Sequence, residues 1–255
     1  MTFACAGTQL VGTVDHAGGL TGVLLVSGGN EVRSGAWNGQ ALLAARLAAR
    51  GVPVMRFDRR GVGDSEGENR GFRDEAEDIR AALAAFRSAV PGMGRVFGFG
   101  NCDAASALML GGGCGLDGLV LSNPWTFDEN GVEDDEAPPP PAALRAHYAQ
   151  RLRDPAALMR LLRGRISLKG LLGSLRAMAA PTLPTTLAGE MTAGLARFAG
   201  PVRILVAERD RTGQAFLGLW PRDNRRVVRC AGASHSYAEE SAQEWLFDQI
   251  FSAVS

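Results

Sequence analysis

Short apolar runs alternate along the chain with stretches of helical period. Runs bounded by glycines and polar turns predict buried strands, and the Ala-, Leu- and Arg-rich stretches between them predict helices. The predicted strands are 23–26, 52–57, 95–99, 119–122, 202–207 and 227–230. The predicted helices are 36–50, 73–89, 103–110, 214–220 and 238–253. This repeated alternation predicts an α/β fold, a mostly parallel sheet with helices on both faces.

The alternation breaks over residues 126–198. Asp128–Glu136 holds six acids, and Pro138–Pro141 is a run of four prolines, which excludes both a helix and a central strand. The rest of the segment has a helical pattern without a convincing strand. We therefore predict a core formed by residues 1–125 and 199–255, with a helical cap inserted at 126–198.

Within the predicted cap, the segment from Arg145 to Arg176 is rich in basic side chains and holds one acid, Asp154. The basic residues are Arg145, Arg151, Arg153, Arg160, Arg163, Arg165, Lys169 and Arg176. Such a run is most often a solvated helix face. It would also suit a lid that attracts an anionic substrate or an acidic carrier. The sequence leaves the two interpretations open.

Composition excludes several classes of protein. The 27 basic and 27 acidic residues give no net charge, so the electrostatic footprint of a nucleic-acid-binding protein is absent. Four widely spaced cysteines without CxxC spacing argue against a disulfide framework and against a metal site. No signal peptide and no apolar run of about 18 residues is evident. We expect a cytoplasmic protein without a membrane span, and its oligomeric state stays open.

The strongest local feature joins a predicted strand to a predicted helix at Gly98–Ser106. A nucleophile elbow needs small residues two positions before and two positions after the nucleophile, because the turn is tight. Gly100 and Ala104 meet this need and place Cys102 at the tip, where serine is the common residue. The alternative is a buried structural cysteine in a glycine-rich turn, and Ser106 is a weaker candidate nucleophile.

An elbow of this kind predicts an acid and then a histidine downstream. Glu208 and Asp210 follow the predicted strand at 202–207, and His235 follows the one at 227–230. We prefer Asp210 as the acid that orients His235, because Glu208 is nearer to its strand and would suit an ion pair. The choice between the two acids stays open.

Acyl transfer also needs hydrogen-bond donors for the oxyanion. The backbone N–H of Asp103, directly after the candidate nucleophile, is one candidate, and that of Gly29, after the first predicted strand, is the second. A further glycine block follows Asp58. It carries Glu66 where a dinucleotide-binding fingerprint needs glycine, and the chain has no P-loop motif, so no cofactor is predicted.

The block Asp58–Ser65, the elbow and the positions of Asp210 and His235 together resemble the α/β-hydrolase fold. The similarity spans almost the whole chain, with the insertion as the cap. A closer resemblance is to the type-one hydrolases associated with exosortase A systems, which accompany bacterial protein-sorting and exopolysaccharide genes. It is carried by Gly28-Gly29 with Arg33 and Gly35, by Val54–Asp58, by Cys102–Ser106 and by the cap segment Tyr148–Leu172.

The chain departs from that group at Asn30-Glu31-Val32 and at Trp37-Asn38, where Pro-Gln-Tyr and His-Arg would be expected. These positions border the predicted oxyanion loop, so the departures put the choice of substrate in doubt. Asn30, Arg33 and Trp37 are therefore the candidate substrate contacts.

The resemblance implies a mechanism. His235 takes the proton of Cys102, Asp210 orients the imidazole, and the thiolate attacks an acyl carbonyl whose oxyanion is held by the N–H groups of Asp103 and Gly29. The expected function is hydrolysis of an ester, thioester or lactone through a covalent acyl-enzyme, with a small-molecule or carrier-bound acyl substrate. The alternatives are an acyltransferase that uses an acceptor other than water, and a non-catalytic scaffold that only binds.

Overall fold

The computed structural model of the chain describes residues 1–127, 185–221 and 224–255. Most of the cap expected at 126–198 therefore lies outside the described residues, including its acidic segment, its proline run and the basic side chains from Arg145 to Arg176. The cap as a separate layer stays a prediction. None of the described helices is long and apolar enough to cross a membrane.

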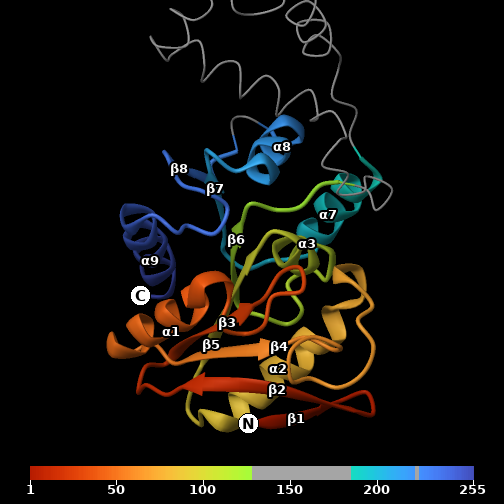
Figure 1. Ribbon diagram of the computed structural model, residues 1–255, viewed down its shortest axis with the longest axis vertical. Helices are drawn as coiled ribbons and strands as arrows, with labels where there is room; N and C mark the ends of the chain where they lie inside the picture. The colour runs from red at the N-terminus through yellow and green to blue at the C-terminus, as the bar shows by residue number, and fades with distance from the viewer. Residues whose placement is uncertain (128–184, 222–223) are drawn as a thin grey trace, which may run out of the picture.

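The described residues form one eight-stranded sheet in the order β1-β2-β4-β3-β5-β6-β7-β8 (Figure 1). β1 and β2 pair antiparallel, β2 is also antiparallel to β4, and the six strands from β3 to β8 run parallel. The strands are β1 (Thr2–Cys5), β2 (Thr8–Asp15), β3 (Thr21–Val26), β4 (Val54–Asp58), β5 (Arg95–Asn101), β6 (Gly118–Ser122), β7 (Val202–Ala207) and β8 (Val227–Cys230).

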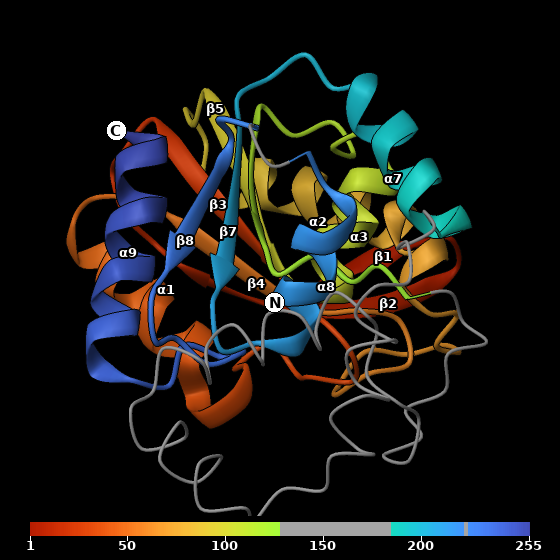
Figure 2. The ribbon, with the colours of Figure 1, turned by 90° about the horizontal axis from the view of Figure 1, so that it is seen from above.

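Helices cover both faces of the sheet (Figure 2). The α-helices are α1 (Gly39–Ala49), α2 (Ala76–Ala89), α3 (Asp103–Leu110), α7 (Thr186–Ala196), α8 (Arg211–Leu219) and α9 (Glu240–Val254), and the short 3-10 turns are η1 (Ala36–Asn38) and η2 (Phe72–Asp74). Helices α1 and α9 lie on one face, and α2, α3, α7 and α8 lie on the other.

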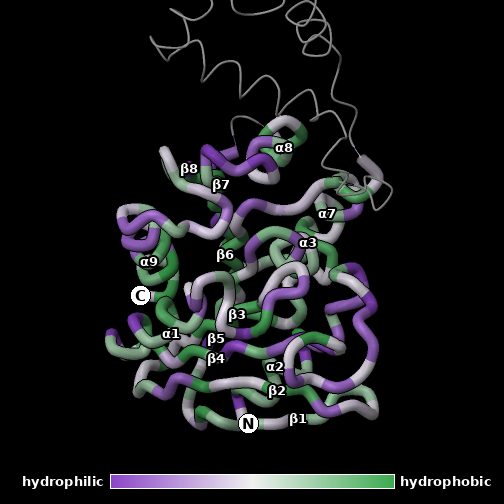
Figure 3. Tube along the Cα trace, viewed as in Figure 1, coloured by the Kyte–Doolittle hydropathy of each residue, from purple (hydrophilic) through white to green (hydrophobic). Residues whose placement is uncertain are grey.

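Alternation along the strands divides the apolar side chains between two cores. On β3, Val23 and Leu25 belong to the core under α1 and α9, whereas Leu24 and Val26 belong to the core under α2 and α3. Figure 3 shows the hydrophobic residues gathered around these central strands, with hydrophilic residues along the outer loops. A strand buried on both faces reads as a continuous apolar run, which is why the sequence predicts the central strands well.

The structure confirms the predicted mostly parallel α/β sheet and adds two strands that the sequence analysis did not predict. β1 and β2 have burial patterns that alternate between core and solvent, and they extend the sheet beyond β4. Within the predicted helices at 36–50 and 73–89, the first residues form η1 and η2. The predicted helix at 214–220 begins earlier, at Arg211, because the carboxylate of Asp210 caps it.

The strand order places the site. The chain goes from β3 to β4 on one side and then crosses to β5 on the other side of β3, so the order reverses at β3. In parallel α/β sheets, ligands bind beyond the carboxyl ends of the strands at such a switch point. Val26 of β3 pairs with Gly100 of β5, which brings the Gly28-Gly29 loop beside Cys102. Asp210 and His235 follow the carboxyl ends of β7 and β8.

Candidate active site

Cys102 stands at a strained turn between β5 and α3. Its φ of 62° and ψ of −127° are rare for a residue other than glycine. Its N–H donates to the carbonyl of Ser122 at 3.0 Å, and its own carbonyl accepts from the N–H of Trp125 at 3.2 Å. Strain of this kind persists only where surrounding structure imposes it. The backbone conformation is the one that a nucleophile elbow requires.

Close packing explains the small residue before the elbow tip. A Cβ atom at Gly100 would lie 2.8 Å from the carbonyl carbon of Ala104, closer than real Cβ contacts come. A larger residue at Gly100 would therefore push the helix away from the strand. This contact with the backbone of Ala104 is the physical reason for the small residue at Gly100, which was inferred from spacing alone.

Asp210 lies against His235, as the sequence analysis preferred. Oδ1 of Asp210 is 3.0 Å from Nδ1 of His235. The same carboxylate caps α8 by accepting from the backbone N–H groups of Thr212 at 3.2 Å and Gly213 at 2.9 Å. Asp210 is buried, whereas Glu208 is exposed. These two hydrogen bonds at the N-terminus of α8 hold the carboxylate in place, so Asp210 is the acid that can orient the imidazole.

His235 bridges the acid and the thiol. Hydrogen bonds to Asp210 and to Cys102 raise the pKa of His235 from 6.5 to about 10, and burial opposes them. The imidazole side chain keeps 41% of its surface exposed, so a substrate can reach it. The structure thus brings together Cys102, His235 and Asp210, the three residues that the sequence analysis selected from separate loops.

Two asparagines hold the His235 loop, and the sequence analysis missed both. Asn123 accepts from the N–H of Ala207 at 2.8 Å and donates to Oδ1 of Asn101 at 3.0 Å and to the carbonyl of His235 at 3.4 Å. Asn101 donates to the same carbonyl at 3.2 Å, and its Nδ2 lies 3.4 Å from Nε2 of His235. The only signal in the sequence is their position: Asn101 is the last residue of β5, and Asn123 directly follows the neighbouring strand β6.

The predicted oxyanion donors lie together, but one of them is already engaged. The backbone N–H of Gly29 donates to Oδ1 of Asp103 at 2.7 Å. A Cβ at Gly28 would lie 2.6 Å from the same oxygen, so only glycine lets the loop approach this closely. The N–H of Asp103 opens α3, where the first N–H groups have no acceptor within the helix. The carboxylate of Asp103 therefore occupies one donor in this conformation.

A buried charged pair stands behind Asp103. Oδ2 of Asp103 lies 3.6 Å from Nη1 of Arg59, which is in turn 3.5 Å from Oε2 of Glu75. Burial, partly offset by Arg59, raises the pKa of Glu75 to about 8. Arg59 thus lies between two carboxyl groups, those of Glu75 and Asp103, at similar distances from each.

The three expected substrate contacts have different surroundings. Arg33 forms ion pairs with Asp58 and with Asp64, the latter at 2.8 Å, so its guanidinium holds the loop after β4. Asn30 accepts a hydrogen bond from Nδ2 of Asn69 at 2.9 Å. Trp37 is 40% exposed and lines a cavity near His235. Of the three, only Trp37 lines that cavity.

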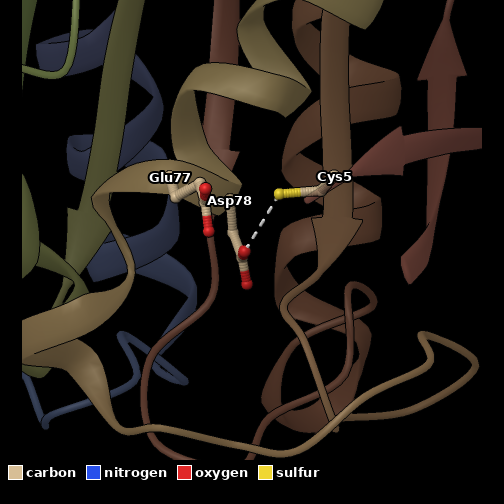
Figure 4. A group of neighbouring side chains, drawn as sticks. All are labelled: Cys5, Glu77 and Asp78. Atoms are coloured by element: carbon tan, nitrogen blue, oxygen red, sulfur yellow. Dashed lines mark hydrogen bonds between the residues drawn. The ribbon is translucent and has the colours of Figure 1, made fainter. Parts of the chain in front are cut away.

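A second group of acidic and sulfur side chains lies beside β1, the edge strand of the sheet. Cys5, Glu77 and Asp78 come close enough to share a metal ion, and Figure 4 shows Cys5 directed toward Asp78. The guanidinium of Arg60 already fills the space between them, donating to Oδ1 of Asp78 at 2.7 Å, to Oε2 of Glu77 at 3.0 Å and to the sulfur of Cys5 at 3.2 Å. These side chains form an ion-pair cluster around Arg60.

Comparisons with known proteins agree with this architecture. Three solved structures similar to the chain are a serine hydrolase homologue from Coxiella burnetii (16% identity, 100% of this chain and 96% of that one, TM-score 0.60), an esterase from Pyrococcus furiosus (15%, 98% and 87%, 0.61) and an α/β hydrolase from Sphaerobacter thermophilus (21%, 100% and 100%, 0.54). No curated protein sequence matches it significantly. The Alpha/beta hydrolase family matches residues 23–249. The chain belongs to the alpha/beta hydrolase family.

Proposed function

We propose that the chain is an acyl hydrolase in which Cys102 is the nucleophile, His235 transfers the proton and Asp210 orients the imidazole. The substrate is an ester, thioester or lactone, either a small molecule or an acyl group on a carrier. The observation that supports this most is the strained backbone of Cys102 beside a histidine whose Nδ1 lies 3.0 Å from a buried carboxylate. Such strain gathers at functional sites.

The chemistry follows from the charge of His235. With a pKa near 10, His235 carries its proton at neutral pH. An imidazolium beside a cysteine is a setting in which a thiolate nucleophile forms. The sulfur of Cys102 bonds to the acyl carbon, the bond from that carbon to the leaving oxygen or sulfur breaks, and His235 gives its proton to the leaving group. Water then attacks the acyl-enzyme and gives a proton to His235, the carbon–sulfur bond breaks, and the acid is released.

The oxyanion formed in each step needs hydrogen-bond donors. Asp103 affects these donors both through its backbone N–H and through its carboxylate. Its backbone N–H is one proposed donor and that of Gly29 is the other, but the carboxylate of Asp103 holds the Gly29 N–H at 2.7 Å. The substrate carbonyl must displace this carboxylate. Arg59, whose Nη1 is 3.6 Å from the other carboxylate oxygen, offers it an alternative partner.

We also propose that the chain belongs to the subgroup associated with exosortase A systems. The support is the resemblance at Gly28-Gly29 and at Cys102–Ser106, and the subgroup supplies no substrate. A suitable panel therefore includes esters, thioesters and lactones. Added alcohols and amines in the same assay would detect transfer to an acceptor other than water.

The test is intact-mass analysis after rapid mixing with p-nitrophenyl acetate or a short acyl thioester. We expect one transient acyl group, located by peptide mapping on Cys102 and absent from Cys102→Ala. In His235→Ala the adduct should form slowly or persist, because deacylation also needs the imidazole. Cys230→Ala is the matched control, since Cys230 is buried. An adduct of equal size in Cys102→Ala, or none in the native chain, would contradict the proposal.

A further inference from the structure

Two backbone groups fix the orientation of the amide pair Asn101 and Asn123 beside His235. The N–H of Ala207 can only donate, and it reaches Oδ1 of Asn123 at 2.8 Å. The amide nitrogen of Asn123 therefore faces Asn101, whose Oδ1 accepts from it at 3.0 Å. The carbonyl of His235 can only accept, and it receives a hydrogen bond from Nδ2 of Asn101 at 3.2 Å. Both ends agree, so Asn101 presents its NH₂ group to the His235 loop.

The surroundings of Asn123 hold this arrangement in place. Asn123 is fully buried, its φ of 43° is rare for a residue other than glycine, and its backbone N–H donates to the carbonyl of Leu205 at 2.9 Å. A Cβ at Gly213 of α8 would lie 2.8 Å from Oδ1 of Asn123, so the glycine leaves room for this amide. If the amide of Asn101 turned over, two NH₂ groups would face each other.

The amide of Asn101 also lies next to the imidazole ring. Its Nδ2 is 3.4 Å from Nε2 of His235. A donor at this place needs a lone pair on Nε2, and the ring has one there only when it is neutral and carries its proton on Nδ1. Nδ1 lies 3.0 Å from Oδ1 of Asp210, which accepts that proton. Asn101 and Asp210 therefore together favour the neutral ring with its proton on Nδ1.

This preference matters at one step of the proposed mechanism. Before acylation, Asp210 from the loop after β7 and Cys102 from the turn after β5 both raise the pKa of His235. Once the sulfur carries an acyl group it has no charge, so it no longer holds a proton on Nε2. In the acyl-enzyme His235 must be neutral to take a proton from water. The contact from Asn101 at 3.4 Å is long, so a water molecule can replace it.

We propose that Asn101, oriented by Asn123, is a positioning residue that keeps His235 neutral in the acyl-enzyme, with its proton on Nδ1, so that Nε2 can accept the proton of the attacking water. The inference rests on the proposed hydrolase function, because it assigns Asn101 to the deacylation step. The hydrogen bond to the His235 carbonyl alone would make Asn101 a structural residue. The contact with Nε2 adds an effect on the protonation of the ring.

The rate of deacylation as a function of pH tests the proposal. The acetyl-enzyme is formed with limiting p-nitrophenyl acetate, and its decay is followed by quenched flow and intact mass. We expect Asn101→Leu, which has a similar volume and no donor, to slow deacylation about tenfold at low pH and to approach the native rate at high pH, because its ring becomes neutral only at a higher pH. An unchanged profile, or an equal loss at every pH, would overturn the proposal.

A second variant keeps the test readable if Asn101→Leu does not fold. Asn101→Asp has the same shape and keeps an acceptor for Nδ2 of Asn123, but it places a carboxylate beside Nε2. A carboxylate favours the charged ring, so the pH of half-maximal deacylation should move up further than in Asn101→Leu. Asn224→Asp is the matched control, since Asn224 precedes β8 and His235 follows it, and it should leave the profile unchanged. A profile that moves down in Asn101→Asp would contradict the assignment.

An NMR titration separates this inference from the hydrolase proposal. If the native chain forms no acyl adduct, the proposed function fails, and the imidazole ¹⁵N signals of His235 still report its protonation. They are recorded in Cys102→Ser, which has no thiolate, and are identified by their absence from His235→Ala. We expect a neutral ring protonated on Nδ1, and a pKa of His235 about half a unit to one unit higher when Asn101→Leu is added. An unchanged pKa would overturn the role of Asn101, whatever the activity.

Discussion

Cys102 and Cys5 both lie among charged side chains, Cys102 between β5 and α3 and Cys5 at the end of the edge strand β1. Cys102 is partly exposed and faces an imidazole that Asp210 holds. Cys5 is buried, donates to Asp78 at 3.3 Å and accepts from Arg60 at 3.2 Å. Burial and the neighbouring Asp78 raise the pKa of the Cys5 thiol to about 11.

The difference between the two settings indicates why Cys102, and not Cys5, is the proposed nucleophile. Both sulfurs have a cation and an acid nearby. At Cys5 the acid bonds the thiol directly and favours its protonated form, and the sulfur is buried. At Cys102 the acid, Asp210, contacts His235 and not the sulfur, and His235 can transfer a proton. The strained backbone of Cys102 places its side chain at the tip of the turn. Proton transfer and access distinguish a nucleophile from a structural thiol.

The largest expected effect compares the two cysteines directly. Cys102→Ala should lower turnover of p-nitrophenyl acetate on the order of 10³-fold or more, because it removes the atom that forms the acyl-enzyme. Cys5→Ala should leave turnover within about twofold and should affect only stability. Steady-state kinetics and urea unfolding of both variants check this. Loss of activity in Cys5→Ala without loss of stability would contradict the assignment of Cys5 as a structural thiol.

The next effect tests the orienting acid. Asp210→Asn should lower kcat on the order of 10³-fold, because the amide cannot stabilise the imidazolium and can favour the wrong tautomer of His235. Glu208→Gln is the matched control and should change kcat by less than about twofold, since Glu208 is exposed. Kinetics with one alkyl ester give both values. Equal losses in the two variants would remove the distinction between these acids.

The raised pKa of His235 predicts a pH dependence. His235 loses its proton as the pH rises through about 10, and an alkyl ester then lacks the acid that its leaving alkoxide requires. We expect kcat/KM for ethyl acetate to fall about tenfold per pH unit above that point. p-Nitrophenyl acetate, whose leaving group needs no proton, should fall less. Parallel profiles for the two esters, corrected for spontaneous hydrolysis, would contradict this role.

The raised pKa of His235 also predicts how the free energy of unfolding changes with pH. The folded-state pKa of His235 lies above its ordinary value of 6.5, so its contribution is fully present below pH 6.5 and is lost as the pH rises through about 10. His235→Ala should therefore lower the free energy of unfolding more at about pH 6 than at about pH 10.5. Urea unfolding at both pH values measures the difference. The partial exposure of the imidazole keeps the effect small.

The smallest expected effect concerns the occupied oxyanion donor. Asp103→Ala frees the N–H of Gly29, so we expect the rate of acylation to rise about fivefold, a gain that corresponds to one displaced hydrogen bond. Asp103→Asn keeps an acceptor for that N–H without the charge and should gain less. Stopped-flow measurement of the acylation burst gives both rates. A slower burst in both variants would mean that Asp103 instead positions the loop for catalysis.

Local signals in the sequence predicted the central sheet and the candidate triad. Each of the strands β3 to β8 is a short apolar run between polar turns, and the turn around Cys102 has its small residues at fixed spacing. Asp210 and His235 could be found because the carboxyl ends of parallel strands meet at one edge of a sheet. The edge strands β1 and β2 were missed because half-buried strands carry a weaker signal, and their pairing depends on β4, far along the chain.

Periodicity and turn spacing are local properties, so the fold class and the order of the candidate nucleophile, acid and histidine could be predicted without the structure. Which of these groups contact one another became known from the folded chain. In the structure Arg33 forms an ion pair with Asp58, and the carboxylate of Asp103 accepts a hydrogen bond from the N–H of Gly29. Asn101 and Asn123 both donate to the carbonyl of His235. The folded chain also forms the cavity near His235 from β5 and two helices distant in sequence. Contacts between remote segments depend on strand order and packing, which no local pattern contains.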